Sequence, residues 1–102
     1  MSNPLLKGLR PMHPGETLRE DVLPALGRPK TEIARLLGVS RQTLYDILEE
    51  RKPVTANMAL RLGKLCGDGP RIWLAMQDAY DLATKGEELA SEIEKIPTLV
   101  AE

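Results

Sequence analysis

The 102-residue sequence has one cysteine, one histidine, one tryptophan, two tyrosines and no phenylalanine. A single cysteine excludes an internal disulfide bond and, with one histidine, leaves too few side chains for a Cys/His metal cluster. No base lies beside a serine in the sequence, and no constellation of acid, base or metal ligands is present. We therefore expect no metal site, no cofactor and no enzymatic activity.

Long apolar runs are also missing. No run approaches the roughly 18 residues that a membrane-spanning helix requires. The first eleven residues, MSNPLLKGLRP, lack the long apolar stretch of a signal peptide. Because a single cysteine also fits a reducing compartment, we expect a cytoplasmic protein that does not contact a membrane.

The apolar residues, 42% of the chain, are mostly Leu, Ile, Val, Ala and Met, which suit helix packing better than a sheet. No period-2 run is long enough for a strand. The pattern predicts an all-α fold of five helices plus a C-terminal helical segment. The expected helices span about 14–27, 31–37, 41–50, 55–67 and 70–84, with Thr31, Ser40 and Thr55 as caps of the second, third and fourth. We divide the chain into an N-terminal arm (1–13), a helix-turn-helix domain (14–84) and an acidic C-terminal segment (85–102).

The stretch IARLLGVSRQTLYDIL (33–48) has a helical apolar pattern that stops at Gly38 and resumes three residues later. Two helices joined by a short turn with a glycine form a helix-turn-helix unit. Ala34 occupies the position where the helices pass closest, and Gly38 the position where φ is positive. The five positions that must face inward are all apolar: Ile33, Leu37, Val39, Leu44 and Ile47. The spacing predicts a helix-turn-helix at 30–50.

The second helix of this unit begins with four polar residues, 40–43. The major groove of B-DNA admits one α-helix and presents a distinct donor and acceptor pattern for each base pair. Arg41 matches guanine O6 and N7, and Gln42 matches adenine N6 and N7. Asp46 either accepts from cytosine N4 or repels DNA and so enforces register. We therefore expect base contacts from Arg41, Gln42, Tyr45 and Asp46.

Charge is segregated along the chain, although the net charge is only −1. Residues 28–71 carry a net +4 and residues 72–102 a net −5. Basic residues bracket the helix-turn-helix, and hydroxyl groups and helix N-termini suit phosphate. We expect phosphate contacts from Lys30, Thr31, Ser40, Thr43, Arg51 and Lys52.

Plainer interpretations stay open at this point. A polar first turn occurs on many surface helices, Arg51 and Lys52 also complement a helix dipole, and helix-turn-helix geometry occurs in proteins that bind no DNA. The agreement of motif spacing, segregated charge and polar residues favours DNA binding.

Four runs together resemble the HigA family of antitoxins over about residues 10–84: MHPGETLRE (12–20), IARLLGVSRQTLYDIL (33–48), PVTANMALRLGKLCG (53–67) and WLAMQDAYDL (73–82). The resemblance implies a lambda-repressor-like helix-turn-helix fold. It also implies a HigB-type toxin partner, a small ribonuclease that cuts mRNA on the ribosome, and repression of a shared operon by a dimer. The family often has Thr-Ser where this chain has Asp68-Gly69, so the cap of the fifth helix departs from its pattern. The triplet at 41–43 varies among relatives, so no operator sequence is implied.

A homodimer would present two recognition helices about 34–36 Å apart, which requires a palindromic operator. We expect the dimer or partner surface to include Trp73, Leu89, Ile93 and Ile96. Two alternatives stay open, because an isolated tryptophan is more often a core residue and the apolar stripe could pack on its own bundle. The acidic surface of the C-terminal segment, or the N-terminal arm, is complementary to a basic ribonuclease.

The sequence thus predicts an antitoxin: a repressor of its own operon that also neutralises a HigB-type toxin. One rival is a solitary transcriptional regulator of the same fold without a toxin. The other is a protein–protein adaptor that binds no DNA.

Overall fold

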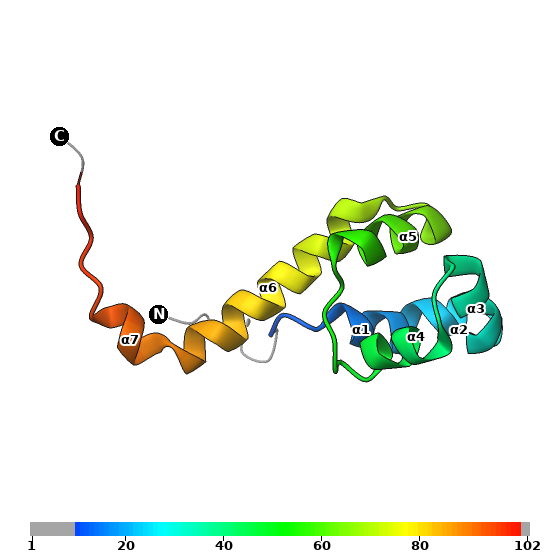
Figure 1. Cartoon of the computed structure of the whole chain (residues 1–102), viewed down its shortest axis with the longest axis horizontal. Coiled ribbons are helices and arrows are strands. Elements are labelled where there is room, and N and C mark those ends of the chain that lie inside the picture. The colour runs from blue at the N-terminus through cyan, green and yellow to red at the C-terminus, as the bar shows by residue number, and fades with distance from the viewer. Residues whose placement is uncertain (1–9, 101–102) are drawn as a thin grey trace.

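In the computed structural model, which describes residues 10–100, the chain is all-helical, and the predicted fold class is confirmed (Figure 1). No strand occurs within that range. Expectations for residues 1–9 and 101–102 lie outside the described residues. The elements are α1 (Pro14–Thr17), η2 (Leu18–Val22), α2 (Leu23–Leu26), α3 (Lys30–Leu37), α4 (Arg41–Leu48), α5 (Ala56–Cys66), α6 (Pro70–Glu88) and α7 (Ala90–Glu94).

The first predicted helix is formed by α1, η2 and α2 in direct succession. The Nδ1 atom of His13 accepts a hydrogen bond from the Gly15 N–H at 2.9 Å and so caps its N-terminus. Gly27, at φ 64°, ends it. The sequence did not predict the π-helical turn of η2. This wider turn ends at Val22, two residues before Pro24, which has no N–H for the helical hydrogen-bond ladder.

The core is a single cluster of aliphatic side chains with one aromatic ring. Of the five predicted inward positions, four are buried and Val39 is partly buried against the cluster. This packing confirms the predicted helix-turn-helix pattern. The cluster contains Leu18, Leu23, Ile33, Ala34, Leu37, Leu44, Ile47, Leu48, Val54, Met58, Ala59, Leu62 and Trp73.

The structure corrects two helix boundaries. Thr31 does not cap α3, because the helix begins one residue earlier and Pro29 is its N-cap. The Pro29 carbonyl accepts from the N–H groups of Glu32 and Ile33, at 3.0 Å each, and no side chain caps the helix. The fifth predicted helix, α6, begins at Pro70 as expected but continues past residue 84 and through Gly86 to Glu88.

Trp73 corrects a further expectation. Its side chain is 1% exposed, and its Nε1 donates to Asp68 Oδ1 at 3.0 Å. The tryptophan therefore lies in the core and does not belong to a dimer or partner surface. The alternative interpretation of an isolated tryptophan is correct.

The second half of α6 and α7 extend away from the bundle (Figure 1). The apolar side chains here are exposed: Ile93 on α7 is 54% accessible, and Ile96, just after α7, is 63% accessible. The alternative in which the apolar stripe of the C-terminal segment packs on its own bundle is therefore wrong, because the bundle does not bury these side chains. Within the described range, none of the helices has the length and apolar character needed to cross a membrane.

Gly15 and Gly86 provide a matched test of how α1 packs on α4. A Cβ at Gly15 would lie 1.8 Å from the Ile47 carbonyl oxygen, whereas a Cβ at Gly86 would meet nothing within 4 Å. We expect Gly15→Ala to lower the free energy of unfolding by about 2–4 kcal/mol. Gly86→Ala should raise it by up to about 1 kcal/mol. Urea unfolding followed by circular dichroism measures both, and equal effects would contradict the proposed contact.

Candidate DNA-binding interface

The corner between α3 and α4 sets the direction of the second helix. Gly38 has φ 75°, and the N–H of Val39 donates to the Ala34 carbonyl at 3.0 Å, as in a Schellman motif. Arg61 on α5 donates from Nη1 to the Leu37 carbonyl at 2.9 Å. The predicted left-handed glycine is confirmed, and α5 holds the corner from outside the helix-turn-helix.

Ser40 caps α4 as predicted. Its Oγ accepts from the Thr43 N–H at 3.0 Å and donates to Thr43 Oγ1 at 2.8 Å. Arg41 and Gln42 follow at the first two positions of the helix, and both are exposed. The N-terminal tip of α4 therefore faces solvent, as the proposed groove contact requires. In Figure 1, α7 lies at the opposite end of the long axis from α4, so the acidic segment is remote from this tip.

One expected phosphate contact, Lys30, lies beside one expected base contact, Tyr45. The Lys30 Nζ lies 5.7 Å from the centroid of the Tyr45 ring, within the range of a cation–π contact. Thr43 and Tyr45 are half-buried. The remaining expected contacts are exposed, except for Asp46: Lys30, Thr31, Ser40, Arg41, Gln42, Arg51 and Lys52.

Asp46 is the exception among these residues, since it is only 8% exposed. Its Oδ1 accepts from Gln42 Nε2 at 2.8 Å and from Arg51 Nε at 3.0 Å, and its Oδ2 lies 3.6 Å from Lys52 Nζ. The hydrogen bond from Gln42 and then that from Arg51 lower the pKa of the Asp46 carboxyl below its usual value. The carboxylate is therefore buried and already paired within the protein, which disfavours the expectation that Asp46 accepts a hydrogen bond from a base.

Two arginines that sequence reasoning missed hold the ends of α4. Arg61 secures the corner before the helix, as described above. Arg19, from η2, donates to the Leu48 carbonyl and lies 3.4 Å from Glu50 Oε2 in the turn that follows the helix. Glu50 has φ 62°, so this turn is held in a conformation that non-glycine residues rarely adopt. Both arginines look like ordinary surface cations in the sequence, and only their distant partners identify their roles.

Gln77 is the buried polar residue of α6. Its Oε1 accepts from the Val54 N–H at 2.8 Å, and its Nε2 donates to Asp81 Oδ1 at 2.9 Å. This network fixes the segment between α4 and α5 against α6. Among residues 10–100, no three His, Cys, Asp or Glu side chains are grouped so that they could hold a metal ion.

The fold and this surface define a helix-turn-helix protein. A curated relative, virulence-associated protein I of Dichelobacter nodosus, is 42% identical over 83 residues, which are 80% of this chain and 77% of the relative. The structure of Pseudomonas aeruginosa antitoxin HigA with higBA promoter is 36% identical, with a TM-score of 0.82, over 89% of this chain and all of that one. The structure of antitoxin GraA in complex with its operator is 43% identical, with a TM-score of 0.83, over 90% of this chain and 94% of that one.

No family model matches the chain. The identities and coverage of these relatives nevertheless show that this chain belongs to the HigA family of antitoxins. The resemblance noted in the sequence is thereby confirmed.

Ser40 and Thr31 form a matched pair that tests the caps of the two helices. Ser40→Ala removes the hydrogen bond from its Oγ to the Thr43 N–H and should lower the free energy of unfolding by about 1 kcal/mol. Thr31→Ala should change it by less than about 0.5 kcal/mol, because Thr31 caps no helix. Urea unfolding without DNA measures both effects. A larger loss for Thr31→Ala than for Ser40→Ala would contradict the assigned caps.

Proposed function

We propose that this protein is an antitoxin that binds double-stranded operator DNA with α4 and represses its own operon. The exposed polar tip of α4, held on a buried helix-turn-helix core, is the observation that carries the proposal. The solved relatives with promoter or operator DNA support it. The cations around α4 supply the sequence-independent attraction to phosphate.

Base reading is assigned to the tip of α4. The guanidinium of Arg41 would bind guanine O6 and N7, and the amide of Gln42 would pair with adenine N6 and N7. Tyr45, half-buried one turn further on, would contact a base edge or the thymine methyl group with its ring. Phosphate contacts are assigned to the polar and basic residues around the tip: Lys30, Thr31, Ser40, Thr43, Arg51 and Lys52.

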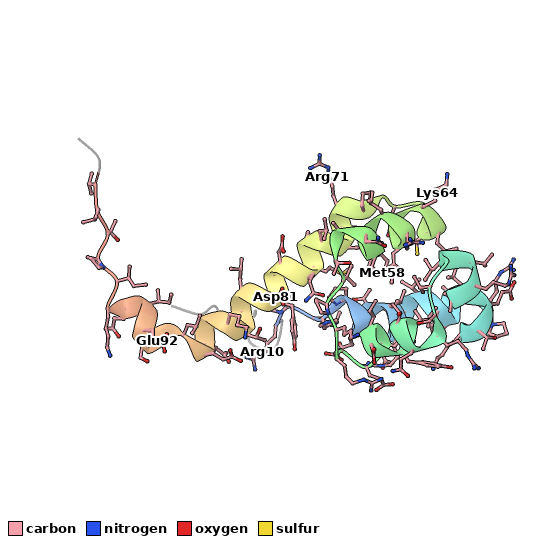
Figure 2. All side chains as sticks on the ribbon, viewed as in Figure 1. Arg10, Met58, Lys64, Arg71, Asp81 and Glu92 are labelled. Carbon is pink, nitrogen blue, oxygen red and sulfur yellow. The ribbon has the colours of Figure 1, made fainter. Side chains whose placement is uncertain are left out.

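Arg41→Ala and Arg71→Ala test the proposed interface, since each removes one exposed positive charge. Arg71, labelled in Figure 2, lies on the α5–α6 side of the bundle, away from α4. Footprinting of the DNA upstream of the gene first identifies the operator. Arg41→Ala should then weaken operator binding roughly 10- to 100-fold, because a good bidentate contact is worth about 1–3 kcal/mol.

Arg71→Ala should change the same affinity by less than about twofold, since distant exposed charges are screened by salt. Fluorescence anisotropy at one fixed salt concentration measures both variants. Equal losses of operator affinity in the two variants would indicate that DNA is attracted by net charge and that Arg41 does not read a base. An unmodified protein that binds no DNA would favour the adaptor.

A homodimer is the second part of the proposal. A palindromic operator requires two copies of α4 one DNA turn apart, and one small domain on one half-site binds weakly at physiological salt. Exposed apolar side chains of α6, of α7 and of the residues next to them supply the surface: Leu82, Leu89, Ile93 and Ile96. Large exposed apolar patches mark sites of association.

Two double variants test this surface. Ile93→Glu with Ile96→Glu places charge where a partner would pack, so it should convert a dimer to a monomer in sedimentation equilibrium. Leu36→Glu with Leu60→Glu is the control, since these side chains are 45% and 62% exposed but lie on α3 and α5. The control should remain dimeric. A monomeric unmodified protein, or dissociation by the control alone, would contradict the assignment.

The third part of the proposal is a HigB-type toxin partner. The C-terminal segment carries Glu87, Glu88, Glu92 and Glu94, all exposed and complementary to a basic RNA-cleaving protein. Glu87 is also paired with Arg10 at 2.7 Å, so the acidic surface and the chain that leads into α1 lie together. Co-purification with the product of a neighbouring gene distinguishes an antitoxin from a solitary regulator.

A further inference from the structure

The carboxylate of Asp46 connects the side chain proposed to read a base with the cations proposed to bind phosphate. Gln42, on the same helix one turn earlier, donates to Oδ1, and Arg51, from the following turn, donates to the same oxygen. Lys52 lies beside Oδ2. The side chain of Asp46 is only 11% exposed, so this carboxylate acts within the protein and not at the DNA surface.

The contact determines how the Gln42 amide is oriented. An ionised carboxylate only accepts hydrogen bonds, so Gln42 must direct its amide nitrogen and not its oxygen toward Asp46. One N–H of that amide is then occupied, while the second N–H and Oε1 remain for an external partner. Pairing with adenine requires one donor and one acceptor from the same amide. The contact with Asp46 therefore leaves one N–H and Oε1 of Gln42 available, which are the donor and the acceptor that adenine requires. It also prevents the amide from rotating by half a turn, which would exchange the positions of donor and acceptor.

The turn after α4 keeps this arrangement in place. The Asp46 carbonyl accepts from the N–H groups of Arg51 and Lys52, at 2.7 and 3.2 Å, which folds the chain back over the carboxylate. Arg19 holds the same turn through Glu50. Because both ends of the network are fixed, the orientation of the Gln42 amide is prepared before any DNA is bound.

We propose that Asp46 is a positioning residue that sets the base preference of Gln42 without touching DNA. The proposal rests on DNA binding by α4, as proposed above. It predicts that Asp46 affects the sequence preference at the base pair that Gln42 reads and has no effect on the preference at the base pair that Arg41 reads.

Selection of binding sites from a random DNA library, followed by sequencing, tests this inference on the full chain. The unmodified protein should select a palindromic motif. Gln42→Ala should lose the preference at one base pair in each half-site. Asp46→Ala should lower the preference at that same base pair at least fivefold and leave the other positions unchanged. In the Gln42→Ala background, Asp46→Ala should have no further effect on the selected motif.

Asp46→Asn is the conservative control. Two donors converge on Oδ1, from Gln42 and Arg51, so an asparagine would keep its oxygen there. It would lose the charge and turn its amide nitrogen toward Lys52 in place of Oδ2. It should retain the preference at the base pair that Gln42 reads, and it keeps the test available if Asp46→Ala does not fold. Thermal unfolding establishes that each variant is folded.

The outcomes separate this inference from the proposed function. If the unmodified protein selects no motif, DNA binding by α4 fails and the inference fails with it. If it selects a motif but Asp46→Ala weakens all sequences alike, DNA binding stands and the positioning role is overturned. Loss of the preference in folded Asp46→Asn would also overturn it, because the hydrogen bond accepted from Gln42 would then not be sufficient to set the preference.

Discussion

The burial of one face of α4 is the constraint on which the rest of this structure depends. Leu44, Ile47 and Leu48 are each no more than 3% exposed, and truncation of such a side chain costs about 2–5 kcal/mol. The first helix approaches so closely at Gly15 that a single methyl group would collide with the α4 backbone. Because that face is buried, the polar residues at the start of α4 have only the outward direction available.

Both ends of α4 are held by partners from distant parts of the chain. Before the helix, the left-handed glycine at position 38 makes the corner and Arg61 closes it. After the helix, Arg19 binds the last carbonyl and the turn at Glu50. A helix of only eight residues would be marginal alone. These contacts hold α4 at both ends, and the base reading proposed for it requires side chains in fixed positions.

The segregation of charge along the sequence becomes a segregation in space. The molecule is elongated, 52 by 34 by 23 Å, and α6 connects the bundle to the acidic segment at the far end (Figure 1). Glu92, labelled in Figure 2, lies on α7 beyond the end of α6. Attraction between exposed charges falls off over about 8 Å at physiological salt. The acidic end therefore has little influence on the potential around α4.

Features that depend on local chemistry could be predicted from the sequence. A serine before a polar turn predicts a cap, a glycine between two apolar patterns predicts a left-handed corner, and both were confirmed at Ser40 and Gly38. The helical spacing of apolar residues likewise predicted the inward positions of the helix-turn-helix. These signals act over three to five residues, so they can be recognised without knowledge of the fold.

Tertiary structure alone decided the features that depend on what surrounds a side chain. Trp73 became a core residue because α6 packs along the bundle, and Gln77 became a buried linker because the Val54 N–H lies against it. Asp46 became an internal acceptor because the following turn brings Arg51 back over it. In each case the sequence would be the same whether the side chain were buried and paired or exposed to solvent. Which of the two occurs depends on desolvation and on partners that only the folded chain brings together.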